Sequence, residues 1–513
     1  MKNNQLKSGI ILSYLTLILG NSISLIYTPL MLRYLGQSEY GLYSLSLSII
    51  SLIGILNFGF GSAVIRYTSK YRAMGEKSLE YSLNGMFLLI FTLIGTMVIV
   101  VGHFLISNID LLFGNSMSIT ELSKMKTLIS ILVFNTAASI IFGFFSLIIT
   151  AYERFIFLKL VALLQAIITP MLIILILVLG YTSIGMVLLT TSINLIILII
   201  NCIYCLKILK VKITFNRVDI KLIKEILNYC FYIFLILIVD KLFWSTDQFI
   251  LGIISGTSSV AVYSIGATFT NYFMAFSTAF SGVYFPKITQ MVTNKVENKE
   301  LSALFIRTGR LQFIILSIII GGFIVVGKEF IITWAGKEYI HAYYLALIVM
   351  IPLCVPLTQT IGIAILQAKN MHRFRSVIYL AIAILNLLLS VPLAQKYGYF
   401  GCALATSVSI LIGHIIIMNI YYYKKIKLDI PVFFKNMSLL LIPLLLSVIV
   451  SVQVKNFDFN NEYWSIITTS MVFLVLYLIL SWLFVFNDYE KTLFKTSISK
   501  FRLRSQEKVS LDN

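Results

Sequence analysis

Long apolar stretches alternate with short polar joints along the whole chain of 513 residues. Fourteen of these stretches approach or exceed twenty residues, and about twenty are needed for an α-helix to cross a bilayer. They cover residues 9–32, 41–65, 84–107, 127–151, 158–180, 183–206, 226–254, 259–285, 311–335, 343–366, 376–395, 400–423, 433–454 and 463–486. The pattern predicts an all-α integral membrane protein with 14 transmembrane helices.

The basic residues fall mostly on alternate joints between these stretches. With the N-terminus placed in the cytoplasm, 32 of the 40 Lys and Arg residues lie in cytoplasmic segments, and seven lie outside. Because cytoplasmic loops of membrane proteins are enriched in Lys and Arg, both termini are predicted to be cytoplasmic. The net charge of +19 therefore sits on loops that face anionic lipid headgroups, and it does not indicate a nucleic-acid partner.

The second half of the chain repeats the first at an offset of 220 residues. Residues 35–44 align with residues 255–264 as short outer hairpins, and residues 70–80 align with residues 290–300 as polar cytoplasmic loops. Six spans, an even number, separate the copies, so the repeats are parallel and related by an axis along the membrane normal. The predicted parts are an N-lobe of helices 1–6 (1–210), a C-lobe of helices 7–12 (211–425), two extra C-terminal helices (426–490) and a basic cytoplasmic tail (491–513).

Three motifs are similar to those of one transporter family. Residues 27–43 (YTPLMLRYLGQSEYGLY) resemble the opening of bacterial polysaccharide-unit flippases, the Wzx-type branch of the MOP exporter superfamily. Residues 57–67 (NFGFGSAVIRY) resemble the second-helix ending of that family, and residues 366–370 (LQAKN) resemble its helix-10 exit. The resemblance implies a MATE-like V-shaped fold. It also implies that an oligosaccharide on undecaprenyl diphosphate crosses the bacterial inner membrane by alternating access, for surface polysaccharide synthesis.

Asp240, Lys241 and Asp247 are the clearest ionisable residues inside a predicted span. An unpaired charge at mid-bilayer costs about 2.5–3.5 kcal/mol on insertion scales, so such residues usually face a cavity or a partner. Asp240, Trp244 and Asp247 have the spacing that places them on one helix face. We predict that Asp240 and Asp247 line the cavity or couple transport to H⁺ or Na⁺. A purely structural Asp240–Lys241 pair is the alternative.

A lipid diphosphate requires positive partners, and Arg can donate bidentate hydrogen bonds to phosphate. The candidate substrate-binding residues are Arg66, Lys70, Lys241, Arg307 and Arg373. Arg66 stands out because it follows a glycine segment, residues 59–61, that favours close helix packing or a bend. Arg33, the basic residue at the outer end of helix 1, is the candidate outer gate. Anchoring to lipid headgroups is the alternative for Arg33 and for the loop residues among them.

Two other functions are alternatives to the flippase. A MATE-type cation-coupled multidrug antiporter would share the fold, and the carboxylates of Asp240 and Asp247 are compatible with this alternative. A membrane-embedded glycan polymerase or ligase needs a catalytic outer loop, but the longest one, about residues 108–126, has no evident acid/base pair. We therefore predict a transporter and not an enzyme, with no cofactor and no metal. The expected partners are the lipid-linked oligosaccharide, membrane lipids and a polysaccharide polymerase.

Overall fold

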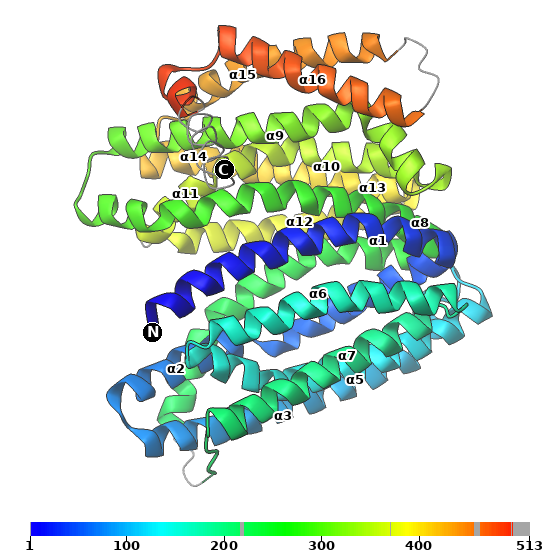
Figure 1. Ribbon diagram of the computed structural model, residues 1–513, viewed down its shortest axis with the longest axis vertical. Helices are drawn as coiled ribbons and strands as arrows, with labels where there is room; N and C mark the ends of the chain where they lie inside the picture. The colour runs from blue at the N-terminus through cyan, green and yellow to red at the C-terminus, as the bar shows by residue number, and fades with distance from the viewer. Residues whose placement is uncertain (1, 216–219, 370, 456–461, 494, 496–513) are drawn as a thin grey trace, which may run out of the picture. The chain divides into compact units, whose positions relative to one another are not determined.

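Helices account for all the regular structure in the described part of the computed structural model (Figure 1). The structure describes residues 2–215, 220–369, 371–455, 462–493 and 495. Its α-helices are α1 Lys2–Ile53, α2 Phe60–Met74, α3 Lys77–Ser107, α4 Ile109–Phe113, α5 Ile119–Ala151, α6 Phe155–Val178, α7 Ser183–Ile203, α8 Ile220–Thr293, α9 Asn298–Trp334, α10 His341–Thr358, α11 Thr360–Ala368, α12 His372–Tyr397, α13 Tyr399–Ile410, α14 Met418–Tyr421, α15 Ile430–Val454 and α16 Glu462–Phe484. The shorter 3₁₀ and π segments are η1 Gly54–Asn57, η2 Tyr204–Ile208, η3 Lys337–Tyr339, η4 Leu411–Ile417 and η5 Tyr422–Ile426.

Twelve helical stretches of the described residues are long and apolar enough to cross a membrane. Two of them, Leu19–Met74 and Lys221–Ser277, contain 56 and 57 residues, more than twice the roughly twenty residues that one crossing needs. Both are interrupted by a glycine in a non-helical conformation, Gly36 (φ 75°, ψ 172°) in α1 and Gly256 (φ 76°, ψ −176°) in α8. The two glycines occupy equivalent positions of the predicted repeat and share one backbone conformation. The all-α membrane fold is confirmed, and the count of fourteen crossings stays a prediction.

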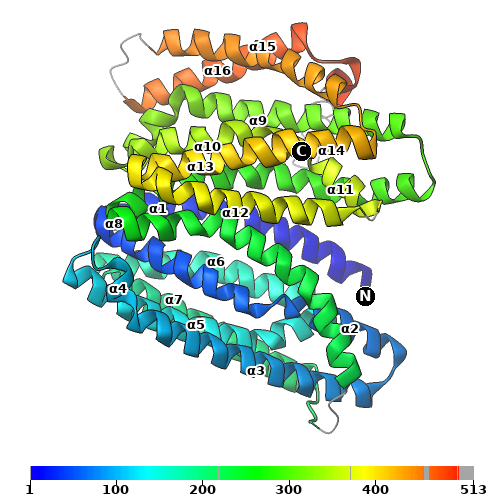
Figure 2. The same ribbon diagram turned by 180° about the vertical axis from the view of Figure 1, so that it is seen from behind.

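The helices form two compact units, and each is described by itself. Unit 1 comprises residues 1–265 and 379–406. In it, α1 packs on α6, while α5 packs against α2, α3 and α7 (Figure 2). Buried aromatic rings fill the contact between α3 and α5, where the ring centroids of Phe91 and Phe144 lie 6.0 Å apart.

Unit 2 comprises residues 266–378 and 407–513. Here α9 packs against α10, α15 and α16, and α15 packs on α16. The rings of Phe305 and Phe433 lie 4.8 Å apart between α9 and α15. Gly309 makes room for this contact, because a Cβ atom there would lie 2.7 Å from the ring of Phe433. The division into an N-lobe, a C-lobe and two extra helices stays a prediction, and most of the predicted tail lies outside the described residues.

The second predicted span is broken near its middle. After η1, Phe58 (φ 49°) and Gly59 (φ 71°) both adopt left-handed backbone conformations, and α2 then begins. Glycine accepts this conformation readily, whereas for Phe58 it costs roughly 1–3 kcal/mol. A Cβ atom on Gly59 would lie 2.5 Å from Cγ2 of Ile233 on α8. The bend and the close packing predicted for this glycine segment are therefore both present.

Candidate functional site

A buried polar cluster surrounds Asp247 inside unit 1. The Asp247 side chain accepts hydrogen bonds from the hydroxyl groups of Tyr263 (2.5 Å), Thr406 (2.8 Å) and Ser390 (2.9 Å). The amide oxygen of Asn386 lies 3.4 Å from both the Ser390 and the Thr406 hydroxyl oxygens. All five residues are buried. Helix α8 supplies Asp247 and Tyr263, α12 supplies Asn386 and Ser390, and α13 supplies Thr406.

The chemistry of this cluster suits a small cation or a proton. Its polar groups are one carboxylate, three hydroxyls and one amide oxygen, and no basic side chain bonds to Asp247 in the described part of the chain. A buried carboxylate is costly unless its charge is balanced. Oxygen atoms are the ligands that hard cations prefer, and intramembrane carboxylates commonly serve ion or proton pathways.

Asp240 and Lys241 lie in a different environment. Asp240 is exposed and Lys241 is half-buried, and among the described residues neither forms an ion pair or a hydrogen bond. The alternative of a structural Asp240–Lys241 pair is thus not observed there. The helix face predicted to carry both Asp240 and Asp247 does not give them equal surroundings, because Asp247 is only 2% exposed.

Arg66 is held against aromatic rings where α2 meets α8. Its guanidinium carbon lies 4.6 Å from the ring centroid of Tyr229 and 5.7 Å from that of Tyr67. The Tyr67 hydroxyl donates a hydrogen bond of 3.0 Å to Glu225. Arg66 itself is exposed, and within the described residues it has no carboxylate partner. Cation–π contact therefore orients the guanidinium while its N–H donors stay available.

Of the other predicted basic residues, Lys70 and Lys241 belong to unit 1 with Arg66, whereas Arg307 and Arg373 belong to unit 2. Lys70, one turn further along α2, is exposed and lies 5.7 Å from the ring of Tyr71. Arg307 belongs to unit 2 and stacks on Tyr489, at 3.1 Å from the ring centroid. The side chain of Arg373 lies outside the described residues.

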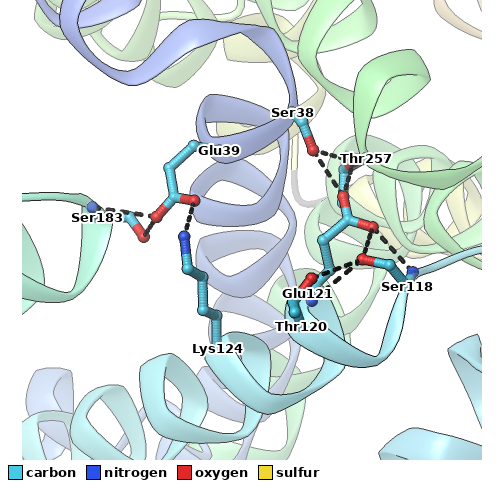
Figure 3. Close-up of polar contacts among 8 residues, drawn as sticks. All are labelled: Ser38, Glu39, Ser118, Thr120, Glu121, Lys124, Ser183 and Thr257. Carbon is cyan, nitrogen blue, oxygen red and sulfur yellow. Dashed lines mark hydrogen bonds and ion pairs between the residues drawn. The ribbon is translucent and has the colours of Figure 1, made fainter.

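Glu121 joins two predicted outer hairpins within unit 1 (Figure 3). One of its carboxylate oxygens accepts hydrogen bonds from Ser38 of α1 (2.6 Å) and from Thr257 of α8 (2.7 Å). The Ser38 and Thr257 hydroxyls lie 3.0 Å from each other. The second oxygen accepts from the backbone N–H and the hydroxyl of Ser118, which caps α5. A single carboxylate thus links α1, α5 and α8.

A second glutamate extends this contact to α7. Glu39 forms an ion pair of 2.7 Å with Lys124 of α5 and accepts a hydrogen bond from the hydroxyl of Ser183 at the start of α7 (Figure 3). The hairpin backbones also meet closely, because a Cβ atom on Gly41 would lie 1.9 Å from the carbonyl oxygen of Thr257. We name the contacts of Ser38, Glu39, Gly41, Glu121, Lys124, Ser183 and Thr257 the outer network.

The predicted outer-gate residue Arg33 is not part of the outer network. It is exposed, and in the described part of the chain it forms no hydrogen bond or ion pair. Glu121 was not among the functional residues predicted from the sequence. Its sequence signal is the Ser118-x-x-Glu121 capping box, which marks the start of a helix and not a gate.

The family model described as "Polysaccharide biosynthesis protein" matches residues 6–292 of this chain. A relative, the probable low-salt glycan biosynthesis flippase Agl15 of Haloferax volcanii, is 23% identical over 207 residues. That alignment covers 40% of this chain and 44% of the relative, so the chain spans less than half the length of that relative.

Two groups of solved structures share the fold. The lipid II flippase MurJ in an inward closed conformation has a TM-score of 0.74 at 18% identity, covering 92% of this chain and 98% of its own. An inward-facing multidrug resistance MATE family transporter of the MOP superfamily has a TM-score of 0.61 at 14% identity, covering 77% of this chain and 93% of its own. The predicted MATE-like helical fold is confirmed.

Proposed function

Because the chain belongs to the polysaccharide biosynthesis protein family, we propose that it is a transporter that flips an undecaprenyl-diphosphate-linked oligosaccharide unit across the bacterial inner membrane. The unit then serves surface polysaccharide synthesis, where a polymerase consumes it. The observation that carries this proposal is the exposed Arg66, oriented by Tyr229 and free of any carboxylate partner in the described chain.

Arg66 has the properties that recognition of a lipid diphosphate needs. A guanidinium forms a planar fork of N–H donors that matches phosphate geometry, and stacking on Tyr229 reduces the freedom lost on binding. Lys70 adds a second positive charge one helical turn away. Two unpaired positive charges attract an anionic substrate and repel a cationic drug. This end of unit 1 therefore favours an anionic substrate over the cationic substrate of a multidrug antiporter.

The buried cluster around Asp247 is the proposed site of the coupling ion. Entry of H⁺ or Na⁺ neutralises the carboxylate and removes the cost of a buried charge. Since the cluster draws its oxygen atoms from α8, α12 and α13, an ion held there favours the arrangement in which these helices lie together. An ion shifts a conformational equilibrium only through such a difference in affinity.

Substitution of Arg66 tests the proposal. In a strain that lacks its own flippase, Arg66→Gln abolishes translocation, whereas Arg66→Lys leaves it partial because an ammonium lacks the fork. The readouts are lipid-linked precursor on the inner leaflet and surface polysaccharide, at equal protein level. Lys77→Gln, which removes one exposed positive charge at the start of α3, is the matched control and keeps full activity.

Two results would contradict this function. Normal surface polysaccharide with Arg66→Gln would make Arg66 a headgroup anchor. Protein-dependent efflux of a cationic dye that requires Asp240, without translocation of any lipid-linked sugar, would instead establish the multidrug antiporter.

A further inference from the structure

A groove of about 700 Å³ lies in unit 2, where α9 begins and η5 leads into α15. Its lining residues are Lys299, Ser302, Ala303, Ile306, Tyr423, Lys427, Leu428 and Asp429. All of them lie on or beside segments predicted to be cytoplasmic. The volume is in the range of sites that hold small molecules or lipid headgroups.

The two lysines and the aspartate that line the groove differ in their hydrogen bonds. Lys299 and Lys427 are exposed, and neither ammonium group forms an ion pair or a hydrogen bond in the described part of the chain. Asp429 is the acidic lining residue, and one of its carboxylate oxygens accepts the backbone N–H of Val432 as the cap of α15. Its own backbone N–H donates to the hydroxyl of Ser302. The groove therefore presents two uncommitted ammonium groups beside a carboxylate that already serves its helix.

The remaining lining residues make the groove amphipathic. Ala303, Ile306 and Leu428 give it an apolar wall, and α9 continues from there as a membrane span. Tyr423 is exposed near the end of the span Tyr399–Ile426, a position where tyrosine is enriched because its ring is apolar and its hydroxyl is wet. A ligand that fits has an anionic head and an apolar body.

We propose that this groove binds the phosphate of an anionic glycerophospholipid from the surrounding leaflet, with the acyl chains along α9. Lys299 and Lys427 bind the phosphate from opposite elements, so the lipid links the start of α9 to the connection before α15. Lys427 holds a left-handed backbone (φ 61°), which lysine rarely adopts. The groove therefore belongs to a defined turn and not to a loose basic tail.

Thermal unfolding of the full chain, purified in detergent, tests the proposal. Phosphatidylglycerol raises the unfolding midpoint of the unaltered protein, while phosphatidylcholine at the same concentration does not. The shift is lost in Lys299→Gln/Lys427→Gln. It persists in Lys424→Gln/Lys425→Gln, which removes two exposed charges from η5 that do not line the groove. If the first double variant is unstable without lipid, Lys299→Gln alone replaces it, because Lys299 lies exposed in the first turn of α9.

Each other result overturns the assignment. Equal loss of the shift in both double variants would mean diffuse attraction to a basic surface. An equal shift with inorganic phosphate alone would make this a site for free phosphate. If undecaprenyl diphosphate displaced phosphatidylglycerol at a lower concentration, the groove would be a binding site for the transported lipid. The proposed function is independent of these outcomes, since Arg66 lies in unit 1.

Discussion

The carboxylate of Asp247 has three hydroxyl donors and no basic partner among the described residues, and we propose that a proton or a mobile cation balances its charge. Asp240, seven residues earlier on the same helix, is exposed. The two carboxylates should therefore respond differently to the same substitution.

Asp247→Asn removes the charge at nearly constant volume, so the fold is retained and the dependence of transport on the driving ion is lost. Transport driven by an imposed Na⁺ or H⁺ gradient falls at least about tenfold, which corresponds to ~1.4 kcal/mol in the barrier to transport. Flipping of a lipid-linked oligosaccharide in proteoliposomes measures it. Asp240→Asn is the comparison and lowers transport without removing the ion dependence. An unchanged ion response in Asp247→Asn would exclude this cluster as the coupling site.

Burial could not be predicted at the residue scale, although the chemistry of single residues could. Asp247 was identifiable because a carboxylate in an apolar span is costly. Its partners Ser390 and Thr406 are neutral and common in membrane helices, and they lie 143 and 159 residues away in sequence. Only the folded arrangement of α8, α12 and α13 turns these hydroxyls into part of a site.

The helix breaks were only partly predictable at the scale of elements. Glycine at residues 59–61 predicted the bend after η1, because glycine accepts a left-handed backbone. The kinks at Gly36 and Gly256 fall within hairpins that were predicted from the polar joints alone. The outer network that joins these hairpins was not predicted, because Glu121 lies 83 residues from Ser38 and 136 from Thr257.

Glu121→Gln should loosen the predicted outer end of unit 1. An amide keeps one acceptor oxygen but loses the charge that strengthens its bonds to Ser38 and Thr257; hydrogen bonds to charged groups contribute about 1.5–3 kcal/mol each. Ser48 is buried on α1, and its hydroxyl donates a hydrogen bond to the carbonyl of Ser245 on α8. Its exposure therefore reports whether α1 and α8 separate. With Ser48→Cys in place, an impermeant thiol reagent reacts about tenfold faster in the Glu121→Gln background.

The matched control for this measurement is Asp110→Asn. Asp110 pairs with Lys126 at 2.6 Å on the same predicted side, but the pair is exposed and links α4 only to α5. An exposed pair contributes 0–1 kcal/mol, so the labelling rate should stay unchanged. Equal acceleration of thiol labelling in both variants would show that Glu121 has no special role in holding α1 and α8 together.

At the scale of the whole molecule, the succession of helices could be predicted from the lengths of the apolar stretches. The division into two compact units could not. Residues 211–265 and 379–406 both belong to the predicted C-lobe, and both lie in unit 1. The cluster around Asp247 holds these two segments together, because Ser390 and Thr406 donate hydrogen bonds to Asp247 and Asn386 donates one to the carbonyl of Phe243. A repeat in sequence records equivalent helices, but it does not determine which helices share contacts.

Orientation in the membrane is the property of the whole chain that the distribution of charge predicts most directly. The split of 32 to seven Lys and Arg residues places the loops around Lys77 and Asn294 inside, and those around Asn115 and Lys337 outside. All four residues are exposed, so single cysteines there can be labelled. Four of the five native cysteines are buried and Cys202 is half-buried, which keeps the background low.

An impermeant maleimide added to spheroplasts should label Asn115→Cys and Lys337→Cys, and should label Lys77→Cys and Asn294→Cys only after the membrane is permeabilised. Because Asn115 and Asn294 lie on either side of α8 in the chain, the experiment also tests whether α8 crosses the bilayer twice. If α8 crossed only once, Asn294→Cys and Lys337→Cys would change sides, whereas Lys77→Cys and Asn115→Cys would not. Labelling of Lys77→Cys and Asn294→Cys on sealed spheroplasts would reverse the orientation, move Arg66 to the outer face, and remove the cytoplasmic diphosphate site on which the proposed function depends.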